Sequence, residues 1–191
     1  SNSTVSNSHA SGNVQAPNAR IVGSLVGSVI SSTLTDVSAT GQVTGFNFTG
    51  GLIGNLENST LSRAFASGAV NGPAVSTGNT SNYGGLLGTA INSTISDVFA
   101  TGAVNAGALR NVGGLIGAMS AGSLTNGYAT GAVTGMTDVG GLIGSAWSPL
   151  FLMGLLVMGA GAVILRASPA TRNEPARPTR SLQIGRASCR E

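Results

Sequence analysis

Apolar residues recur along this chain at fixed distances from a short glycine motif. The motif reads GSLVG at residues 23–27 and GGLIG or GGLLG at residues 50–54, 84–88, 113–117 and 140–144. Seven residues after its last glycine stand Leu34, Leu61, Ile95 and Leu124, with Val5 in the matching place of the first copy. Sixteen residues after it stand Val43, Val70, Val104 and Val133, with Val14 matching. Disordered chains do not keep apolar residues in such a register, so the pattern predicts a folded repeat.

A second motif, Ala-[Ser/Thr]-Gly-x-Val, alternates with the first. Its central glycines are Gly12, Gly41, Gly68, Gly102 and Gly131. From the last glycine of the first motif to the central glycine of the second the step is always 14 residues, whereas the return step is 15, 13, 20, 15 or 13. We expect the invariant half to form stacked strands and the variable half to contain an exposed turn, with the longest insertion at residues 72–82.

The repeat unit favours strands over helices. Glycine costs about 1 kcal/mol at an interior helix position, and no apolar stripe of helical period occurs. A coil of 27 to 34 residues can hold three short strands, for example residues 51–53, 59–65 and 67–70. A single coil cannot bury its own apolar face, so coils should stack about 4.8 Å apart, each strand pairing with its copies. The sequence therefore predicts an all-β parallel β-helix of about five coils, with a length of about 24 Å. A right-handed helix is favoured.

A column of larger side chains is predicted on the invariant half. Eleven residues after the anchor glycine stand Ser38, Phe65, Phe99 and Tyr128, and His9 falls in the same register. No cysteine or second histidine accompanies His9. We therefore expect His9 to be a stacked column residue rather than a metal ligand or part of a nucleophile pair.

A change of composition after Gly144 predicts the organisation of the chain. Residues 1–144 are the repeat region, which begins inside a repeat, and residues 145–149 are a linker. An uncharged run of sixteen residues then extends from Leu150 to Leu165, with Trp147 before it and a basic tail at residues 166–182. This order is typical of a membrane helix with a cytoplasmic C-terminus, and of a cleaved bacterial sorting signal. Because sixteen residues span only about 24 Å as a helix, a capping strand or helix stays open as an alternative.

The last nine residues, 183–191 (QIGRASCRE), resemble the in-frame translation of a common sequencing-library adapter and are set aside as an artefact. They contain Cys189, the single cysteine of the chain. We therefore expect neither a disulfide framework nor a thiolate metal site.

Charge is scarce and unevenly placed. Charged residues make up 8% of the chain, against about 25% in an average soluble domain. Residues 1–145 hold three arginines and four acids, whereas the chain from residue 146 holds six arginines and two acids. A basic tail behind an apolar run indicates membrane topology, so nucleic acid is excluded as a partner.

The sequence predicts no catalytic, cofactor-binding or metal-binding residues. Asp36 and Asp97 share a register, but Arg63 and Asn126 occupy the equivalent places. Neither a carboxylate ladder nor a calcium column is therefore expected, and the acids are assigned to surface solvation. 

Two further polar patterns are given no function. Asn-x-Ser/Thr sequons begin at Asn2, Asn47, Asn58, Asn79 and Asn92, and we attribute them to composition. A threonine column is formed by Thr40, Thr101 and Thr130 and is broken by Ser67. One broken column is too little for a flat ice-binding array.

The GGLIG and GGLLG motifs of residues 1–144 resemble the Gly-Leu-hydrophobic-Gly signature of the GLUG-motif family. Ser24 departs from that signature, so its coil is expected to be looser. The resemblance implies a bacterial surface or secreted protein, either adhesin-like or a repeat region attached to a peptidase. We expect a non-enzymatic, membrane-anchored surface rod with host or matrix glycans or proteins as partners. A stalk belonging to a secreted enzyme, with its catalytic domain upstream, remains the alternative.

Overall fold

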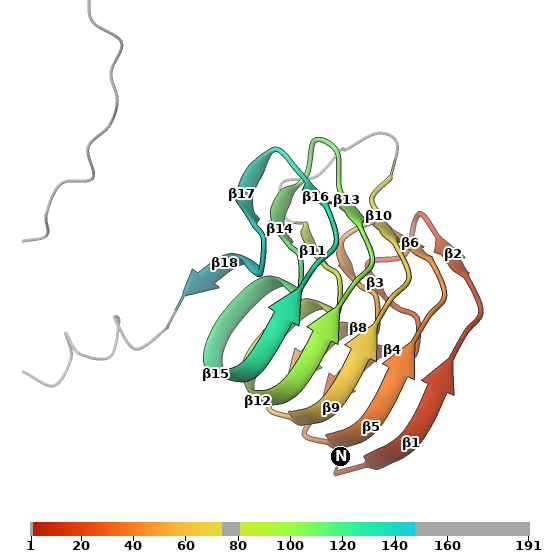
Figure 1. Cartoon of the computed structure of the whole chain (residues 1–191), viewed down its shortest axis with the longest axis vertical. Coiled ribbons are helices and arrows are strands. Elements are labelled where there is room, and N and C mark those ends of the chain that lie inside the picture. Colours follow the sequence, from red (N-terminus) through yellow and green to blue (C-terminus); the bar gives the residue numbers. More distant parts are fainter. Residues whose placement is uncertain (1, 74–80, 148–191) are drawn as a thin grey trace, which may run out of the picture. The chain divides into compact units, whose positions relative to one another are not determined.

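The computed structural model describes residues 2–73 and 81–147 and shows an all-β solenoid of about five coils (Figure 1). Its strands form three parallel sheets, and successive strands of each sheet come from successive coils. The prediction of a parallel β-solenoid is therefore confirmed. Of the linker predicted at residues 145–149, residues 145–147 form the end of a strand, so the solenoid extends past Gly144. The rest of that linker, the expected helix at residues 150–165 and the basic tail lie outside the described residues.

The three sheets are named here for their composition. The long sheet contains β1 (Thr4–Ala10), β4 (Val26–Ile30), β5 (Thr33–Ala39), β8 (Ile53–Glu57), β9 (Thr60–Ala66), β12 (Leu87–Ala100), β15 (Ile116–Ala129) and β18 (Ile143–Trp147). The valine sheet contains β2 (Val14–Ala16), β6 (Val43–Gly45), β10 (Val70–Asn71), β13 (Val104–Asn105) and β16 (Val133–Thr134). The glycine sheet contains β3 (Ile21–Gly23), β7 (Phe48–Gly50), β11 (Asn82–Gly84), β14 (Arg110–Gly113) and β17 (Thr137–Gly140).

The strand register matches the spacing of the apolar residues in the sequence. Leu34 pairs with Val5 and with Leu61, and Ile95 pairs with Leu61 and Leu124. The valine column pairs in the same way along its sheet. The hydrophobic columns predicted from the sequence are thus confirmed residue by residue.

Strand boundaries agree less well with the prediction. Residues 59–65 correspond to β9 within one residue, whereas only the last residue of 67–70 belongs to a strand, β10. Residues 51 and 52 form a bend between the glycine sheet and the long sheet, so only Ile53 of the strand predicted at 51–53 belongs to a strand, β8. The GGLIG and GGLLG motifs form this corner. Glycine is needed there because backbone of the chain lies against it: a Cβ built on Gly84 would overlap the carbonyl oxygen of Leu87.

In the long strands, the alternation of inward and outward side chains shifts by one residue at a column of residues with left-handed backbone conformation. Asp36, at φ 55°, lies in the middle of β5, and its neighbours in the register adopt the same conformation. These are Asn7, Arg63, Asp97 and Asn126. Around Asp36 the buried positions run 34, 37 and 39, so Thr35 and Asp36 both face outward. Each coil therefore presents one extra outward side chain on this side, as in a β-bulge.

Two clusters of apolar side chains fill the solenoid. The larger cluster lies inside the long sheet and is built from the leucine and isoleucine columns, including the fully buried Leu61, Leu86 and Ile95. The smaller cluster lies between the valine and glycine sheets, around Tyr83. In the first coil Ser24 replaces a glycine of the corner motif, and its hydroxyl is buried without a hydrogen-bond partner. Burial of an unsatisfied hydroxyl is unfavourable, which marks this corner as a local weakness.

Candidate functional site

The outer surface of the long sheet carries the most regular arrangement of side chains on the solenoid. We call the outward residues of β1, β5, β9, β12 and β15 the ladder face. Parallel pairing brings equivalent residues of successive coils together, about 4.8 Å apart. Four kinds of column result, running along the solenoid axis: hydroxyl, charged, aromatic and, at the corner, asparagine.

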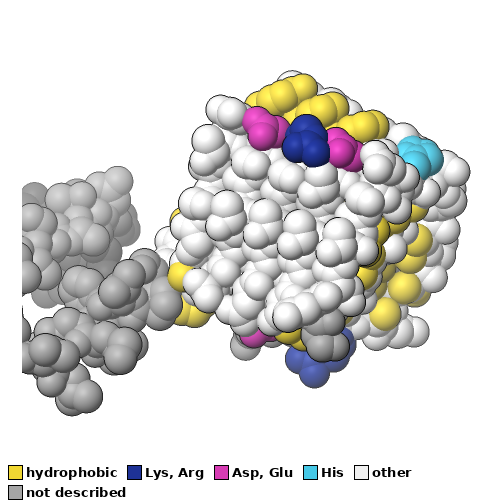
Figure 2. Space-filling view, turned by 90° about the horizontal axis from the view of Figure 1, so that it is seen from below, with side chains coloured by type: hydrophobic (Ala, Val, Ile, Leu, Met, Phe, Trp, Pro, Cys, Tyr) yellow, Lys and Arg dark blue, Asp and Glu magenta, His cyan; other side chains and the backbone are white. Residues whose placement is uncertain are grey.

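Two adjacent columns consist entirely of serine and threonine. The first column contains Thr4, Thr33, Thr60, Thr94 and Ser123. The second contains Ser6, Thr35, Ser62, Ser96 and Thr125. Figure 2 shows a broad white surface that lacks charged side chains, with acidic and basic groups at its margins. Neither column was singled out in the sequence, although a Ser/Thr-apolar-Ser/Thr triplet recurs in every copy.

The charged column contains one tight ion pair. Arg63 Nε donates to Asp36 Oδ1 at 2.7 Å, and Arg63 Nη2 donates to Asp36 Oδ2 at 2.8 Å. The hydrogen bonds from Arg63 lower the pKa of the Asp36 carboxyl. Next along the column, Asn126 Nδ2 donates to Asp97 Oδ1 at 2.9 Å. The register predicted for these four residues is confirmed, and each carboxylate has a partner of its own.

The aromatic column is stacked face to face. The ring centroids of Phe65 and Phe99 are 5.0 Å apart, those of Phe99 and Tyr128 are 5.1 Å apart, and both pairs are within 4° of parallel. The column continues through Ser38 to His9, whose Nδ1 lies 2.9 Å from the Ser38 hydroxyl oxygen. His9 is thus a column residue, as predicted. Ser38 is the one position in this column without a ring, so one face of Phe65 has no stacking partner.

The corner between β8 and β9 has the sequence Asn-Ser-Thr, which recurs at residues 2–4 and 92–94, and each of its three residues has a separate role. Asn58 is left-handed, at φ 48°, and accepts a hydrogen bond from Asn92 of the next coil. Ser59 Oγ donates to the Glu57 carbonyl and accepts from the Ser32 amide. Thr60 begins the outer hydroxyl column. The sequons at Asn2, Asn58 and Asn92 are therefore explained by the corner itself, since asparagine tolerates the left-handed region.

A shallow polar groove of about 290 Å³ follows this corner across the first three coils. Its lining is Asn2, Ser3, Thr4, Ser31, Ser32, Thr33, Asn58, Ser59 and Thr60. The groove contains no charged or aromatic side chain. Its surface is mainly polar, so it offers hydrogen-bonding groups and little apolar surface on which a ligand could pack.

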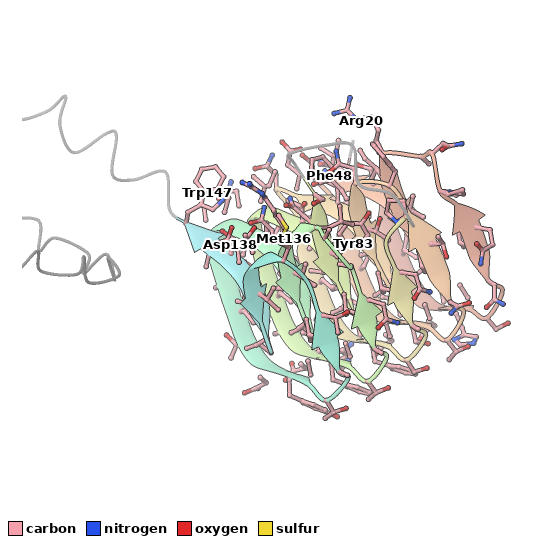
Figure 3. The ribbon with its side chains drawn as sticks, turned by 90° about the horizontal axis from the view of Figure 1, so that it is seen from above. Arg20, Phe48, Tyr83, Met136, Asp138 and Trp147 are labelled. Atoms are coloured by element: carbon pink, nitrogen blue, oxygen red, sulfur yellow. The ribbon has the colours of Figure 1, made fainter. Side chains whose placement is uncertain are left out.

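On the opposite side of the solenoid, the glycine sheet contains one buried tyrosine. Tyr83 is fully buried in β11, and its hydroxyl donates to the Gly45 carbonyl at 3.0 Å. Burial raises the pKa of Tyr83 to about 12, with a nearby Thr49 hydroxyl opposing the shift. In Figure 3 Tyr83 lies within the ribbon, whereas Arg20 projects away from it. Met136 and Trp147 are exposed, at 57% and 61%. Polar side chains also meet on this side: Asn111 Nδ2 donates to Asn82 Oδ1 at 2.8 Å, and Asn82 Nδ2 donates to the hydroxyl of the buried Thr89 at 2.9 Å.

In residues 2–73 and 81–147 no three of the His, Cys, Asp and Glu side chains gather closely enough to hold a metal ion. The same residues contain no helix of the length and hydrophobicity needed to span a membrane. Comparison of the chain with protein-family models, curated proteins and solved structures found no match.

Proposed function

We propose that the chain is a non-enzymatic surface module: an adhesin-like rod of stacked coils, attached or sorted through the apolar run at residues 150–165. The observation that carries this proposal is the continuity of the ladder face. Its columns run from the first described coil to the last without converging on a cleft. A repetitive exposed surface suits repeated weak contacts with an extended partner, because linked contacts raise the apparent affinity.

The ionisable groups support a binding module over an enzyme. General acid–base catalysis needs carboxyl or imidazole groups placed together around a substrate. Asp36 is held by Arg63 and Asp97 by Asn126, while His9 contacts Ser38. The two carboxylates lie in the charged column and His9 lies in the aromatic column of the same exposed face, and their contacts stabilise the stacking of coils. The resemblance to the GLUG-motif family agrees with such a surface role.

Attachment is tested with the full chain exported from a bacterium and followed by cell fractionation. The variant Leu156→Arg places a charge at the centre of the apolar run, where a charged side chain costs about 3 kcal/mol in a membrane helix. The expected result is that the parent chain stays in the carbonate-washed membrane or cell-wall fraction and the variant is released. Leu182→Arg, in the tail, is the control and should behave as the parent. Equal retention of the Leu156→Arg variant would refute the anchor.

Adhesion is tested with the same exporting cells on surfaces coated with matrix glycoproteins. Cells carrying the parent chain should adhere more than cells that carry the apolar run and tail alone. Protease treatment of intact cells should abolish the difference, because the rod lies outside the membrane. If the two cell types adhere equally to every coating, the adhesin role is wrong, whatever the result of the fractionation.

A further inference from the structure

The interrupted aromatic column contains a gap the size of one ring. Ser38 pairs with His9 on one side and with Phe65 on the other. His9 and Phe65 are therefore two coils apart, or about 9.6 Å. A ring inserted between them needs van der Waals contact on each face, about 3.5 to 4.0 Å per contact, or 7 to 8 Å in all. The space above the Ser38 side chain is thus wide enough for one ring.

The two walls of this gap differ in chemistry. Phe65 offers an aromatic face, because its other face is already covered by Phe99 in the stack. His9 is exposed, and its Nδ1 lies 2.9 Å from the Ser38 hydroxyl oxygen. The floor is the half-buried Ser38 hydroxyl. The Phe65 wall is therefore apolar, whereas the His9 wall and the Ser38 floor carry groups that can form hydrogen bonds with a ligand.

The rim of the gap is polar and electrically balanced. Asp36 and Thr40 stand two residues to either side of Ser38 along the chain, about 6.6 Å away at strand spacing. Arg63 is paired with Asp36 through two hydrogen bonds, which fix both groups. The side chains of this pair remain 58% and 42% exposed, so they can still contact a ligand. A rim of paired opposite charges favours a neutral ligand with several hydroxyl groups.

We propose that this gap, bounded by Phe65, Ser38 and His9, binds one pyranose ring of a neutral glycan. A pyranose has a face of C–H groups that packs on an aromatic ring and hydroxyl groups around its edge that bond to polar residues. An aromatic side chain of a protein partner would fill the same width but leave the polar rim largely without partners, which is unfavourable. The proposal rests on the adhesin role proposed above and assigns its ligand class.

The decisive variant is Ser38→Phe, which completes the aromatic column. The new ring should stack on Phe65 and raise the Tm by a few degrees, since aromatic pairs are stabilising. The same ring occupies the gap and should weaken glycan binding at least about tenfold. A misfolded variant would lose binding with a lower Tm, so the two readouts separate blockage from damage. Gln15→Phe, on the exposed side of β2, is the matched control and should change neither binding nor the gap.

Binding is measured by saturation-transfer NMR and titration with the methyl pyranosides of glucose, galactose, mannose and N-acetylglucosamine. N-acetyltryptophanamide serves as the aromatic probe. The expected result is millimolar binding of at least one pyranoside, lost in Ser38→Phe and weakened in Phe65→Leu. The latter keeps the site apolar but removes the ring face. No pyranoside binding by the parent chain, binding retained by Ser38→Phe, or binding of the aromatic probe alone would each overturn the proposal.

The cell adhesion assay separates this proposal from the broader one. If Ser38→Phe loses pyranoside binding and cell adhesion together, both proposals are supported. If the parent chain binds no pyranoside and cells carrying Ser38→Phe adhere as the parent cells do, the gap is not the binding site and the adhesin role stands. If the parent chain binds a pyranoside but its cells do not adhere, the adhesin role fails and the sugar site remains.

Discussion

The amide of Ser32 donates a hydrogen bond of 3.1 Å to the hydroxyl of Ser59, one coil further along the solenoid. The Ser59 amide donates in the same way to Ser93 at 3.2 Å, and the Ser3 amide donates to Ser32 at 3.2 Å. Each hydroxyl also donates within its own coil, to a carbonyl two residues earlier. The serine column therefore satisfies both backbone amides and carbonyls at a corner where regular pairing stops.

Replacement of Ser59 by alanine should interrupt the hydrogen bonds of this serine column in the middle. The Ser32 amide and the Glu57 carbonyl would both lose a partner, and Ser59 is only 5% exposed. We expect the free energy of unfolding to fall by about 1 to 3 kcal/mol in urea denaturation. Ser67→Ala, at an exposed position directly after β9, is the control with a small effect. If the free energy of unfolding falls no more than in the control, water replaces the hydrogen bonds of the Ser59 hydroxyl.

Replacement of Gly84 by alanine should be among the most damaging single changes. Its Cβ would overlap the Leu87 carbonyl and approach the Gly117 amide at 2.7 Å, so backbone must move in two coils. We expect a loss of about 4 kcal/mol or more, or failure to fold, because such strain lies in the tail of mutational effects. Gly12→Ala has nothing within 4 Å of its Cβ and serves as the matched control. The two variants are compared by thermal unfolding, and equal Tm values would contradict the corner geometry.

Ala121→Asn should stabilise the protein. Ala121 is left-handed, at φ 56°, in the column that holds asparagine at Asn58 and Asn92. The left-handed region costs most L-residues about 1 to 2 kcal/mol but is tolerated by asparagine. We therefore expect a gain of about 1 kcal/mol, helped by a new amide contact to Asn92. Ala132→Asn tests whether asparagine alone is responsible, since Ala132 does not have a positive φ. A gain in both variants, or in neither, would contradict the prediction.

Stability should fall in alkali because of Tyr83. Its pKa is about 12 in the folded chain and about 10 when unfolded. The unfolded chain therefore loses the phenol proton first, and stability decreases as the pH rises from 10 to 12, by about 2 kcal/mol. Tyr83→Phe should lack this decrease, although loss of the bond to Gly45 lowers its stability at neutral pH by about 1 kcal/mol. Tyr128→Phe changes an exposed phenol and should keep the decrease. Urea titrations at fixed pH values measure each curve.

Much of the fold could be predicted because buried residues leave a periodic record in the sequence. The residues equivalent to Leu61 and to Val70 must face the core in every coil, so the spacing between these two positions is maintained. Strand ends could not be predicted in this way. The bend at residues 51 and 52 is apolar and glycine-rich, as a buried strand would be, and only contacts between coils distinguish the two.

The candidate site was less accessible to sequence reasoning. The aromatic column could be predicted, because rings in one register must stack once coils pair. The hydroxyl columns flank the leucine column by simple alternation, but serine and threonine are so common in this chain that their recurrence gave no separate signal. Ser38 was placed in its column, but a gap becomes visible only when Phe65 and Phe99 prove to be stacked face to face. The bond between Arg63 and Asp36 likewise depends on side-chain conformation, which register alone does not give.

The constant half of each coil has a consequence for the gene as well as for the protein. Because every ladder contact joins a residue to its equivalent in the next coil, duplication of one whole repeat leaves each added residue with the same neighbours. Such a duplication would lengthen the rod by about 4.8 Å per coil without a new folding problem. Reach can therefore change in discrete steps by recombination between repeats, while the variable connections accept insertions independently.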